Sequence, residues 1–266
     1  MPSLNQVAEA QVVKLLLLGN SGAGKTGALG SLAAAGYRLF IADFDSGTDI
    51  LLDEKILPRE ARSHVYVKNF YDKHLLTGGK ATAQPKGIKD FISALGKWRE
   101  GEEDLGNIYS WGPKDVFVID SLTFLGNACM NEALALSGHL GQRPTQPDWG
   151  AAIDQQESII EMLYNPAVKC NVVITSHLSP ISGDAAETGG VTRMFPSALG
   201  KKLPTKISRY FNNVVLIRKS GSGEKVRREL VTTATTDTDL KAAKPSKVPA
   251  VMEADLGKLF QALLAS

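Results

Sequence analysis

The 266-residue sequence predicts an α/β fold in which a mostly parallel sheet is flanked by helices. Three observations support this prediction. Short apolar runs alternate with longer helix-like segments along most of the chain. These runs are apolar throughout, which is typical of strands buried on both faces of a parallel sheet. The hydrophobic content of 43% is enough for a sizeable core and differs from that of disordered, collagen-like or coiled-coil chains.

The expected elements follow one another in a regular order. Strands are predicted over Val12–Leu18, Arg38–Asp43, Val65–Asn69, Asp115–Asp120 and Asn171–Thr175. The first and the last two of these are expected to be buried, and Val65–Asn69 is expected to be short. Helices are predicted over Thr26–Ala35, Ile88–Trp98, Leu122–Leu136 and Ala151–Leu163. Gly36 suits the left-handed position that ends the first of these helices.

The last part of the chain changes character. Asn213–Lys219 and Lys225–Thr232 flank SGSG and predict a C-terminal β-hairpin, and Asp255–Leu264 predicts a final helix. Tyr71–Gly87 and Ser179–Thr192 are expected to be long loops. We therefore expect an N-terminal tail (1–11), one core (12–235), and a basic linker with a C-terminal helix that packs on the core (236–266).

Composition excludes several classes of protein. Cys129 and Cys170 lie far apart and form no CxxC pair, and the four histidines lack metal-ligand spacing, so a disulfide scaffold or a zinc site is not expected. The N-terminus lacks a signal-peptide pattern, and VVKLLLLG is too short to span a membrane. We expect a soluble cytoplasmic protein with no membrane partner.

The strongest motif is GNSGAGKT, from Gly19 to Thr26, which fits the phosphate-loop pattern GxxxxGK[ST]. It lies between an apolar strand and a helix, where that motif must lie. Glycines let backbone N–H groups converge on phosphate oxygens, and the helix N-terminus favours the same anion. Lys25 would reach the β- and γ-phosphates of ATP, and the Thr26 hydroxyl would ligate Mg²⁺. The expected nucleotide-binding residues are Gly19, Asn20, Ser21, Gly22, Ala23, Gly24, Lys25, Thr26 and Gly27.

A second motif, DVFVIDS, places Asp120 at the end of an apolar strand. A carboxylate in this place holds Mg²⁺ in P-loop enzymes, the Walker-B role. The alternative is an aspartate that only caps the next helix. With the phosphate loop upstream, we expect Asp120 to support the metal.

Ser121 follows Asp120, where many P-loop ATPases carry glutamate, so a general base must come from elsewhere. Asp45 lies just past the second strand and can orient a water molecule toward the γ-phosphate. Asp43 is the alternative base, and a simple turn around Asp45 is the alternative structure. His177 follows the NVVIT strand, where it could sense the γ-phosphate or merely cap the strand.

Together these motifs resemble the RecA-like ATPases, from Val12 to Thr233. VFVIDSLTFLG resembles their Walker-B neighbourhood, ITSHL their sensor strand, and ISGDAAETGG their second DNA-binding loop. The short chain is most similar to the phage RecA-like ATPases of single-strand annealing and recombination. Two departures are evident. Asp45 stands where RecA has glutamate, which implies slow hydrolysis, and a Phe-x-x-Ala assembly signature is missing from the N-terminus.

The resemblance implies binding of ATP, Mg²⁺ and single-stranded DNA, and self-assembly into rings or filaments. A single-strand DNA-binding protein would be a further partner, and the host cytoplasm the location of a phage-encoded chain. Between residues 191 and 248 there are 13 Lys and Arg against 4 Asp and Glu, a charge suited to nucleic acid. The expected DNA contacts are Arg193, Lys201, Lys202, Lys206 and Arg209. Lys241 or Lys244 would reach the ATP of a neighbouring subunit, or belong only to a basic linker.

Three other functions remain open from the sequence. A P-loop phosphotransferase acting on a small molecule is possible, although no arginine-rich lid helix is evident. A helicase-type or packaging-type motor subunit would share the same core. A nucleotide-gated binding module with negligible turnover is compatible with the short carboxylate of Asp45.

Overall fold

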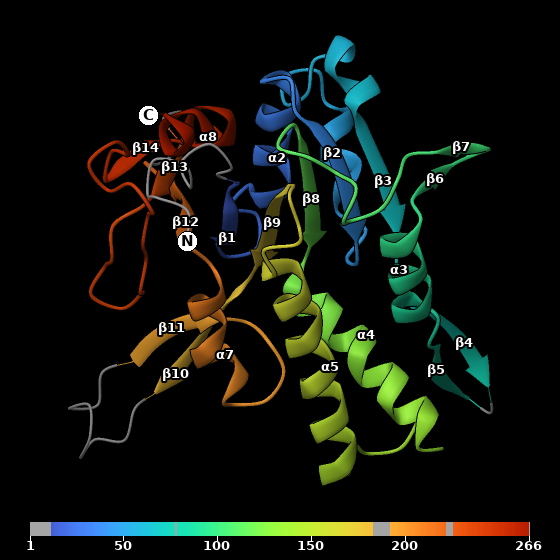
Figure 1. Cartoon of the computed structure of the whole chain (residues 1–266). Coiled ribbons are helices and arrows are strands. Elements are labelled where there is room, and N and C mark those ends of the chain that lie inside the picture. The colour runs from blue at the N-terminus through green and yellow to red at the C-terminus, as the bar shows by residue number, and fades with distance from the viewer. Residues whose placement is uncertain (1–11, 78, 183–191, 222–225, 266) are drawn as a thin grey trace, which may run out of the picture.

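The computed structural model describes residues 12–77, 79–182, 192–221 and 226–265 (Figure 1). Its centre is an eight-stranded sheet in the order β14-β13-β12-β1-β9-β8-β2-β3. The strands from β12 to β3 are parallel, and β13 and β14 extend the sheet in antiparallel pairing. The bounds are β1 Lys14–Leu18, β2 Arg38–Asp43, β3 Val65–Asn69, β8 Asp115–Asp120, β9 Asn171–Ser176, β12 Asn213–Ser220, β13 Arg227–Val231 and β14 Val251–Glu253.

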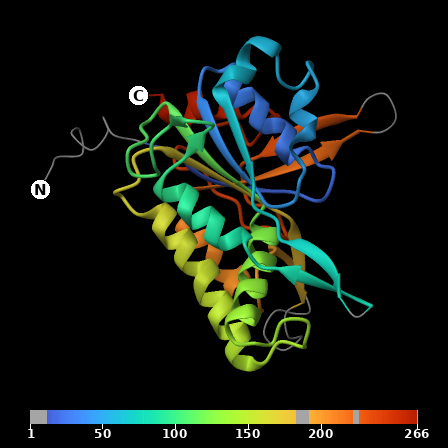
Figure 2. The same cartoon turned by 90° about the vertical axis from the view of Figure 1, so that its right-hand side faces the viewer.

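Helices cover both faces of this sheet, so the predicted fold class is confirmed (Figures 1 and 2). The α-helices are α2 Lys25–Ala34, α3 Gly87–Gly96, α4 Leu122–Leu136, α5 Gln146–Tyr164, α7 Leu203–Ile207 and α8 Leu256–Leu264. Short 3₁₀ helices lie at Thr48–Leu52 (η2), Arg59–His64 (η3) and Ser208–Tyr210 (η4). None of the helices in the described part of the chain is both long and apolar enough to cross a membrane.

The two faces of the sheet bury two separate cores. Leu15 and Leu17 of β1 pack toward α2 and α8, whereas Leu16 and Leu18 pack toward the side of α3, α4 and α5. This alternation follows from the two-residue side-chain period of a strand. Because both faces are covered, β1 is apolar at four successive positions, and the sequence signal for it is strong.

The predicted loop Tyr71–Gly87 is wrong, because this segment contains the hairpin of β4 (Lys73–Thr77) and β5 (Lys80–Gln84). The hairpin projects from the body beyond α3 (Figure 2). A projecting hairpin lacks the half-buried face that gives a strand its apolar alternation, so periodicity did not reveal it. A second small hairpin joins β6 (Arg99–Glu100) to β7 (Glu103–Asp104).

The predicted loop Ser179–Thr192 is also corrected at its two ends. Leu178–Ser182 forms β10 and pairs with β11, Thr192–Pro196, in antiparallel register. Residues 183–191 lie outside the described residues. The ends of the segment are therefore held as a two-stranded ribbon rather than as open loop.

Helix α5 begins at Gln146, five residues before the predicted start at Ala151. Thr145 is its N-cap and forms a capping box with Asp148, whose carboxylate accepts a hydrogen bond from the Thr145 N–H at 2.7 Å. Asp148 therefore caps the helix from inside its first turn, and Trp149 lies within the helix.

At the opposite edge of the sheet from the phosphate loop, Asn171 ties three segments together. Its Oδ1 accepts from the Val13 N–H at 2.8 Å, and its Nδ2 donates to the carbonyls of Pro113 (2.8 Å) and Asp115 (3.1 Å). The side chain is fully buried, so water cannot take over its hydrogen bonds to these backbone groups.

We therefore expect Asn171→Ala to lower the free energy of unfolding by about 3 kcal/mol, because it leaves buried backbone groups unpaired. The control is Asn165→Ala, whose side chain accepts only from the Ala167 N–H in an exposed turn and should cost less than about 1 kcal/mol. Urea unfolding of both variants is the measurement. Equal losses would contradict this account of the sheet edge.

Candidate nucleotide-binding site

The segment from Gly19 to Gly24 joins β1 to α2 at the carboxyl edge of the sheet. Gly24 is the N-cap of α2 with φ +103°, and Gly22 has φ +70°, a left-handed backbone that glycine adopts without strain. A Cβ at Gly19 would lie 2.7 Å from the Ile217 carbonyl oxygen, so this position needs glycine for lack of space. The loop therefore presents bare backbone at the helix N-terminus, as anion binding requires.

Lys25, the first residue of α2, extends across this loop. Its Nζ donates to the carbonyl oxygens of Gly19 (2.9 Å) and Asn20 (3.2 Å). Burial lowers the pKa of Lys25, while the charges of Asp120 and Asp45 act in the opposite direction. The ammonium group is thus held beside two carboxylates at the mouth of the phosphate loop.

Asp120 is the last residue of β8 and is buried. Its Oδ2 accepts from the Thr26 hydroxyl at 2.6 Å, and its Oδ1 accepts from the Thr175 hydroxyl of β9. Burial raises the pKa of Asp120, and these two hydrogen bonds oppose the rise. The carboxylate is thereby fixed at the place where α2, β8 and β9 meet.

This arrangement fits Mg²⁺. The cation prefers hard oxygen ligands and usually takes one or two carboxylates together with substrate phosphates and water. Thr26 and Asp120 supply a hydroxyl and a carboxylate that already touch. Within the described ranges no three His, Cys, Asp or Glu side chains gather into a metal cluster, so a site made of protein ligands alone is not found there.

Asp43 and Asp45 have different surroundings at the end of β2. Asp43 is fully buried and accepts from the N–H groups of Asp45 (3.0 Å) and Ser46 (2.7 Å) and from the Thr48 hydroxyl (2.8 Å). It therefore organises the turn. Asp45 lines the cavity, and burial, with the charges of Asp120 and Asp43, raises its pKa to about 6.

His177 follows β9 directly and is half-buried at the same edge. Its ring packs edge-on against Phe124 of α4, with 6.3 Å between the ring centres. Burial lowers the pKa of His177, and Lys25 lowers it further. The imidazole is therefore neutral at pH 7 and can either donate or accept a hydrogen bond.

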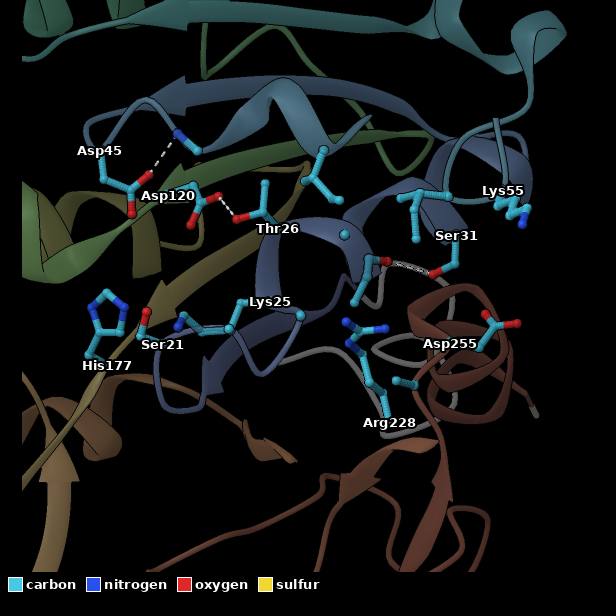
Figure 3. Close-up of a pocket in the computed structure, with 18 of the residues that line it drawn as sticks. Ser21, Lys25, Thr26, Ser31, Asp45, Lys55, Asp120, His177, Arg228 and Asp255 are labelled. Atoms are coloured by element: carbon cyan, nitrogen blue, oxygen red, sulfur yellow. Dashed lines mark hydrogen bonds between the residues drawn. The ribbon is translucent and has the colours of Figure 1, made fainter. Parts of the chain in front are cut away.

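These side chains line one cavity of about 730 Å³ (Figure 3). Asp45, Asp120 and His177 lie at one end. Ser31, Arg228 and Asp255 lie at the other, so β13 and the start of α8 complete the wall. This volume is typical of a pocket for a small molecule or cofactor. Sequence reasoning missed the second end, because an arginine in a predicted hairpin carries no motif.

The structure places the predicted DNA contacts away from this cavity, along β11, α7 and η4. Arg193 forms an ion pair with Asp239, and Lys206 lies 3.6 Å from Glu157. Lys201 and Lys202 precede α7, and Arg209 lies in η4; all three are exposed. Five cations therefore follow one continuous stretch, with two of them engaged by carboxylates.

Two aromatic side chains, Tyr210 and Phe195, lie in the same stretch of chain as these cations. The Tyr210 hydroxyl donates to Glu157 (2.7 Å) and Glu161 (2.9 Å), so this side chain is held against α5. Phe195 of β11 is partly exposed.

Neither Lys241 nor Lys244 lines the cavity of its own chain. Lys241 forms an isolated bridge with Val214, near the amino end of β12. The Lys244 Nζ donates to the Ala265 carbonyl at 2.7 Å. A role at a neighbouring subunit stays a prediction for both.

A family model described as an AAA domain matches residues 11–242. No match was found among curated proteins.

Solved structures with a similar arrangement include a KaiC-like protein from the archaeon Pyrococcus horikoshii OT3, with 11% identity and a TM-score of 0.41 over 91% of this chain and 89% of that one. Flagellar accessory protein FlaH from Methanocaldococcus jannaschii has 10% identity and a TM-score of 0.43 over 94% and 89%. An ATPase from the type III secretion system of pathogenic bacteria has 12% identity and a TM-score of 0.42 over 90% of this chain and 56% of that one. At these values the similarities carry no argument about activity.

The raised pKa of Asp45 predicts a measurable cost in stability. With a folded-state pKa of about 6 against an ordinary value of 3.8, the cost of ionising Asp45 grows between about pH 4 and pH 6 and is fully present above pH 6. We expect Asp45→Asn to raise the melting temperature at pH 8 by about 2–4 °C, the shift that about 1 kcal/mol causes in a chain of this size after allowing for partial exposure to water.

This gain should disappear as the pH falls toward 4, because the Asp45 carboxyl group of the folded wild type is then neutral, like the asparagine side chain of the variant. Exposed Asp49 provides the control, because Asp49→Asn makes the same substitution in the same segment outside the cavity lining. Thermal melts across this pH range are the measurement. A destabilised Asp45→Asn at pH 8 would be incompatible with the proposed environment of this carboxyl group.

Proposed function

Because this chain belongs to the AAA domain family, we propose that it binds Mg·ATP, hydrolyses it, and uses the nucleotide to control binding of single-stranded DNA. The observation that carries the proposal is the convergence of Lys25, Thr26, Asp120 and Asp45 on one cavity at the carboxyl edge of the sheet. Ligands of open parallel sheets bind at this edge.

ATP fits the cavity with its phosphates on the glycine-rich loop. Backbone N–H groups between Gly19 and Gly24 would cradle the α- and β-phosphates, and the Lys25 ammonium would lie against the β- and γ-phosphates. Thr26 and Asp120 would hold Mg²⁺ between them. When bound, this cation neutralises charge that develops on the phosphate oxygens.

Asp45 is the proposed general base for hydrolysis. A water molecule held by the Asp45 carboxylate attacks the γ-phosphorus and gives a proton to that carboxylate as the new O–P bond forms. The bond from the γ-phosphorus to the bridging oxygen breaks, and ADP and inorganic phosphate result. A pKa of about 6 leaves Asp45 ionised at pH 7 yet close enough to neutral for efficient proton transfer.

His177 is the proposed γ-phosphate sensor. It is neutral, lines the cavity, and is joined directly to Leu178, the first residue of β10. A hydrogen bond gained or lost at the imidazole would therefore shift the start of β10, at the base of the β10–β11 ribbon. The connection predicts that ATP alters the ribbon and the segment that joins its strands; that segment, residues 183–191, lies outside the described residues.

Single-stranded DNA is the proposed ligand of the stretch from β11 to η4. Lys201, Lys202 and Arg209 are exposed there and make no side-chain hydrogen bond or ion pair to other described residues. Cations in such a row bind phosphates without reading base sequence. We place the protein with the short phage RecA-like ATPases of recombination or annealing, acting as a ring or filament of identical subunits.

Rates of ATP hydrolysis with and without single-stranded DNA test this function. We expect stimulation by DNA that weakens steeply between about 50 and 200 mM salt, because phosphate contacts release counterions. Lys25→Ala should abolish turnover, since it removes the cation that binds the β- and γ-phosphates. Lys201→Ala combined with Lys202→Ala should keep basal hydrolysis and lose most of the stimulation.

The alternatives give different results. Turnover that is indifferent to DNA but rises with a small phosphate acceptor would favour a phosphotransferase. Nucleotide binding without measurable turnover would favour a nucleotide-gated binding module. Either result would contradict a DNA-dependent ATPase.

A further inference from the structure

Two cations face each other across the hairpin of β12 and β13. Lys219 and Arg228 are directly opposite in the antiparallel register. Paired residues of this kind point to the same face of a sheet, and like charges placed so repel each other. Ile217 and Leu230, the next pair on that face, are buried in the core beneath α2 and α8. The two cations therefore extend beyond the core on the side of the phosphate loop.

Both side chains reach that loop. A Cβ at Gly24 would lie 2.5 Å from Cδ and 2.7 Å from Nε of Arg228, so only glycine lets this side chain cross the loop. A Cβ at Gly22 would lie 3.6 Å from the Lys219 Nζ. Figure 3 shows Arg228 pointing from β13 into the cavity beside α2.

Glu253 and Asp255 line the same cavity as Arg228, and both are paired with Lys258, at 2.9 Å and 3.5 Å. Neither the Lys219 nor the Arg228 side chain forms a hydrogen bond or an ion pair with another described residue. On the other face of the same hairpin, Arg218 is paired with Glu229 at 3.5 Å. Within the described part of the hairpin, the face that meets the phosphate loop thus carries two cations that form no ion pair.

We propose that Arg228 is a nucleotide-binding residue that contacts the phosphates common to ATP and ADP, with Lys219 adding positive potential behind it. The inference deepens the proposed function and rests on it. The γ-phosphate end of the cavity is marked by Asp45, Asp120 and His177, whereas Arg228 lies against Gly24, where the backbone cradles the α- and β-phosphates. A guanidinium group suits this role, because its fork of donors matches phosphate oxygens.

The consequence concerns product release. A contact to shared phosphates strengthens ATP and ADP binding alike, so it holds ADP after hydrolysis instead of lowering the barrier. The same contact would fasten the β12–β13 hairpin to the phosphate loop through the nucleotide. The hairpin would then report whether the cavity holds a nucleotide, while His177 would report whether the γ-phosphate is present.

The test compares Arg228→Gln with Arg227→Gln. Arg227 is the neighbouring arginine on β13 and pairs with Ser220, so its side chain points to the opposite face. Arg227→Gln therefore removes the same charge from β13 without altering a side chain that meets the loop. Glutamine keeps much of the aliphatic stem, and Arg228 is exposed, so the fold should persist. Calorimetry would measure the affinity for ADP. Competition against ADP would measure the affinity for inorganic pyrophosphate.

We expect Arg228→Gln to weaken the binding of both ADP and pyrophosphate by about tenfold or more, since a hydrogen bond to a charged group is lost. Arg227→Gln should remain within about twofold of the wild type, as ordinary surface changes do. Arg228→Lys should recover part of the loss.

Wild-type affinity for ADP in Arg228→Gln would overturn the inference and leave the proposed function intact. Weaker ADP binding with unchanged pyrophosphate binding would place Arg228 on the nucleoside, which also overturns the phosphate contact. A wild-type chain that binds neither ATP nor ADP would instead refute the proposed function itself.

Discussion

The carboxylate of Asp120 accepts hydrogen bonds from the hydroxyls of Thr26 and Thr175, and the rest of the site depends on this arrangement. These two bonds join the N-terminus of α2 to the carboxyl ends of β8 and β9. The strands are parallel, so their ends meet at one edge, and the loops after them bring Asp45 and His177 to the same cavity. The two hydrogen bonds oppose the rise that burial causes in the pKa of Asp120, and the Asp120 charge adds to burial in raising the pKa of neighbouring Asp45.

The C-terminal part of the chain builds the other half of the cavity. The antiparallel strands β13 and β14 and helix α8 bring Arg228 and Asp255 beside α2. Ser31 of α2 links the two halves, because its Oγ accepts from the Leu256 N–H at 2.8 Å. The phosphate loop therefore lies between one end of the cavity lined by residues that follow the parallel strands and another end lined by Arg228 of the hairpin. Under the proposed function, this division would separate sensing of the γ-phosphate from retention of the diphosphate.

The sequence predicts buried elements well and exposed ones poorly. Arg38–Asp43, Asp115–Asp120 and Leu122–Leu136 form with the predicted bounds, because packing on the sheet imposes their composition. The edge strand Val65–Asn69 also forms with its predicted bounds, although it is only partly buried. The β4–β5 hairpin does not pack on the sheet, so no comparable apolar pattern is imposed on its sequence. Within the site, the phosphate loop, Asp120, Asp45 and His177 could be predicted because each lies at or just after the end of a predicted strand. Arg228 does not, since its role depends on the register that sets it opposite Lys219 and across Gly24.

The most direct test of the central claim is the dependence of ATP binding on Mg²⁺, measured by calorimetry in the wild type and in Asp120→Asn. If Asp120 and Thr26 form the metal site, Mg²⁺ should strengthen ATP binding by the wild type. Asp120→Asn should lose about 10–100-fold of that gain, the usual cost of altering the residues around a bound metal. It should keep similar affinity for ATP without the metal. An equal response to Mg²⁺ in both proteins would contradict the account.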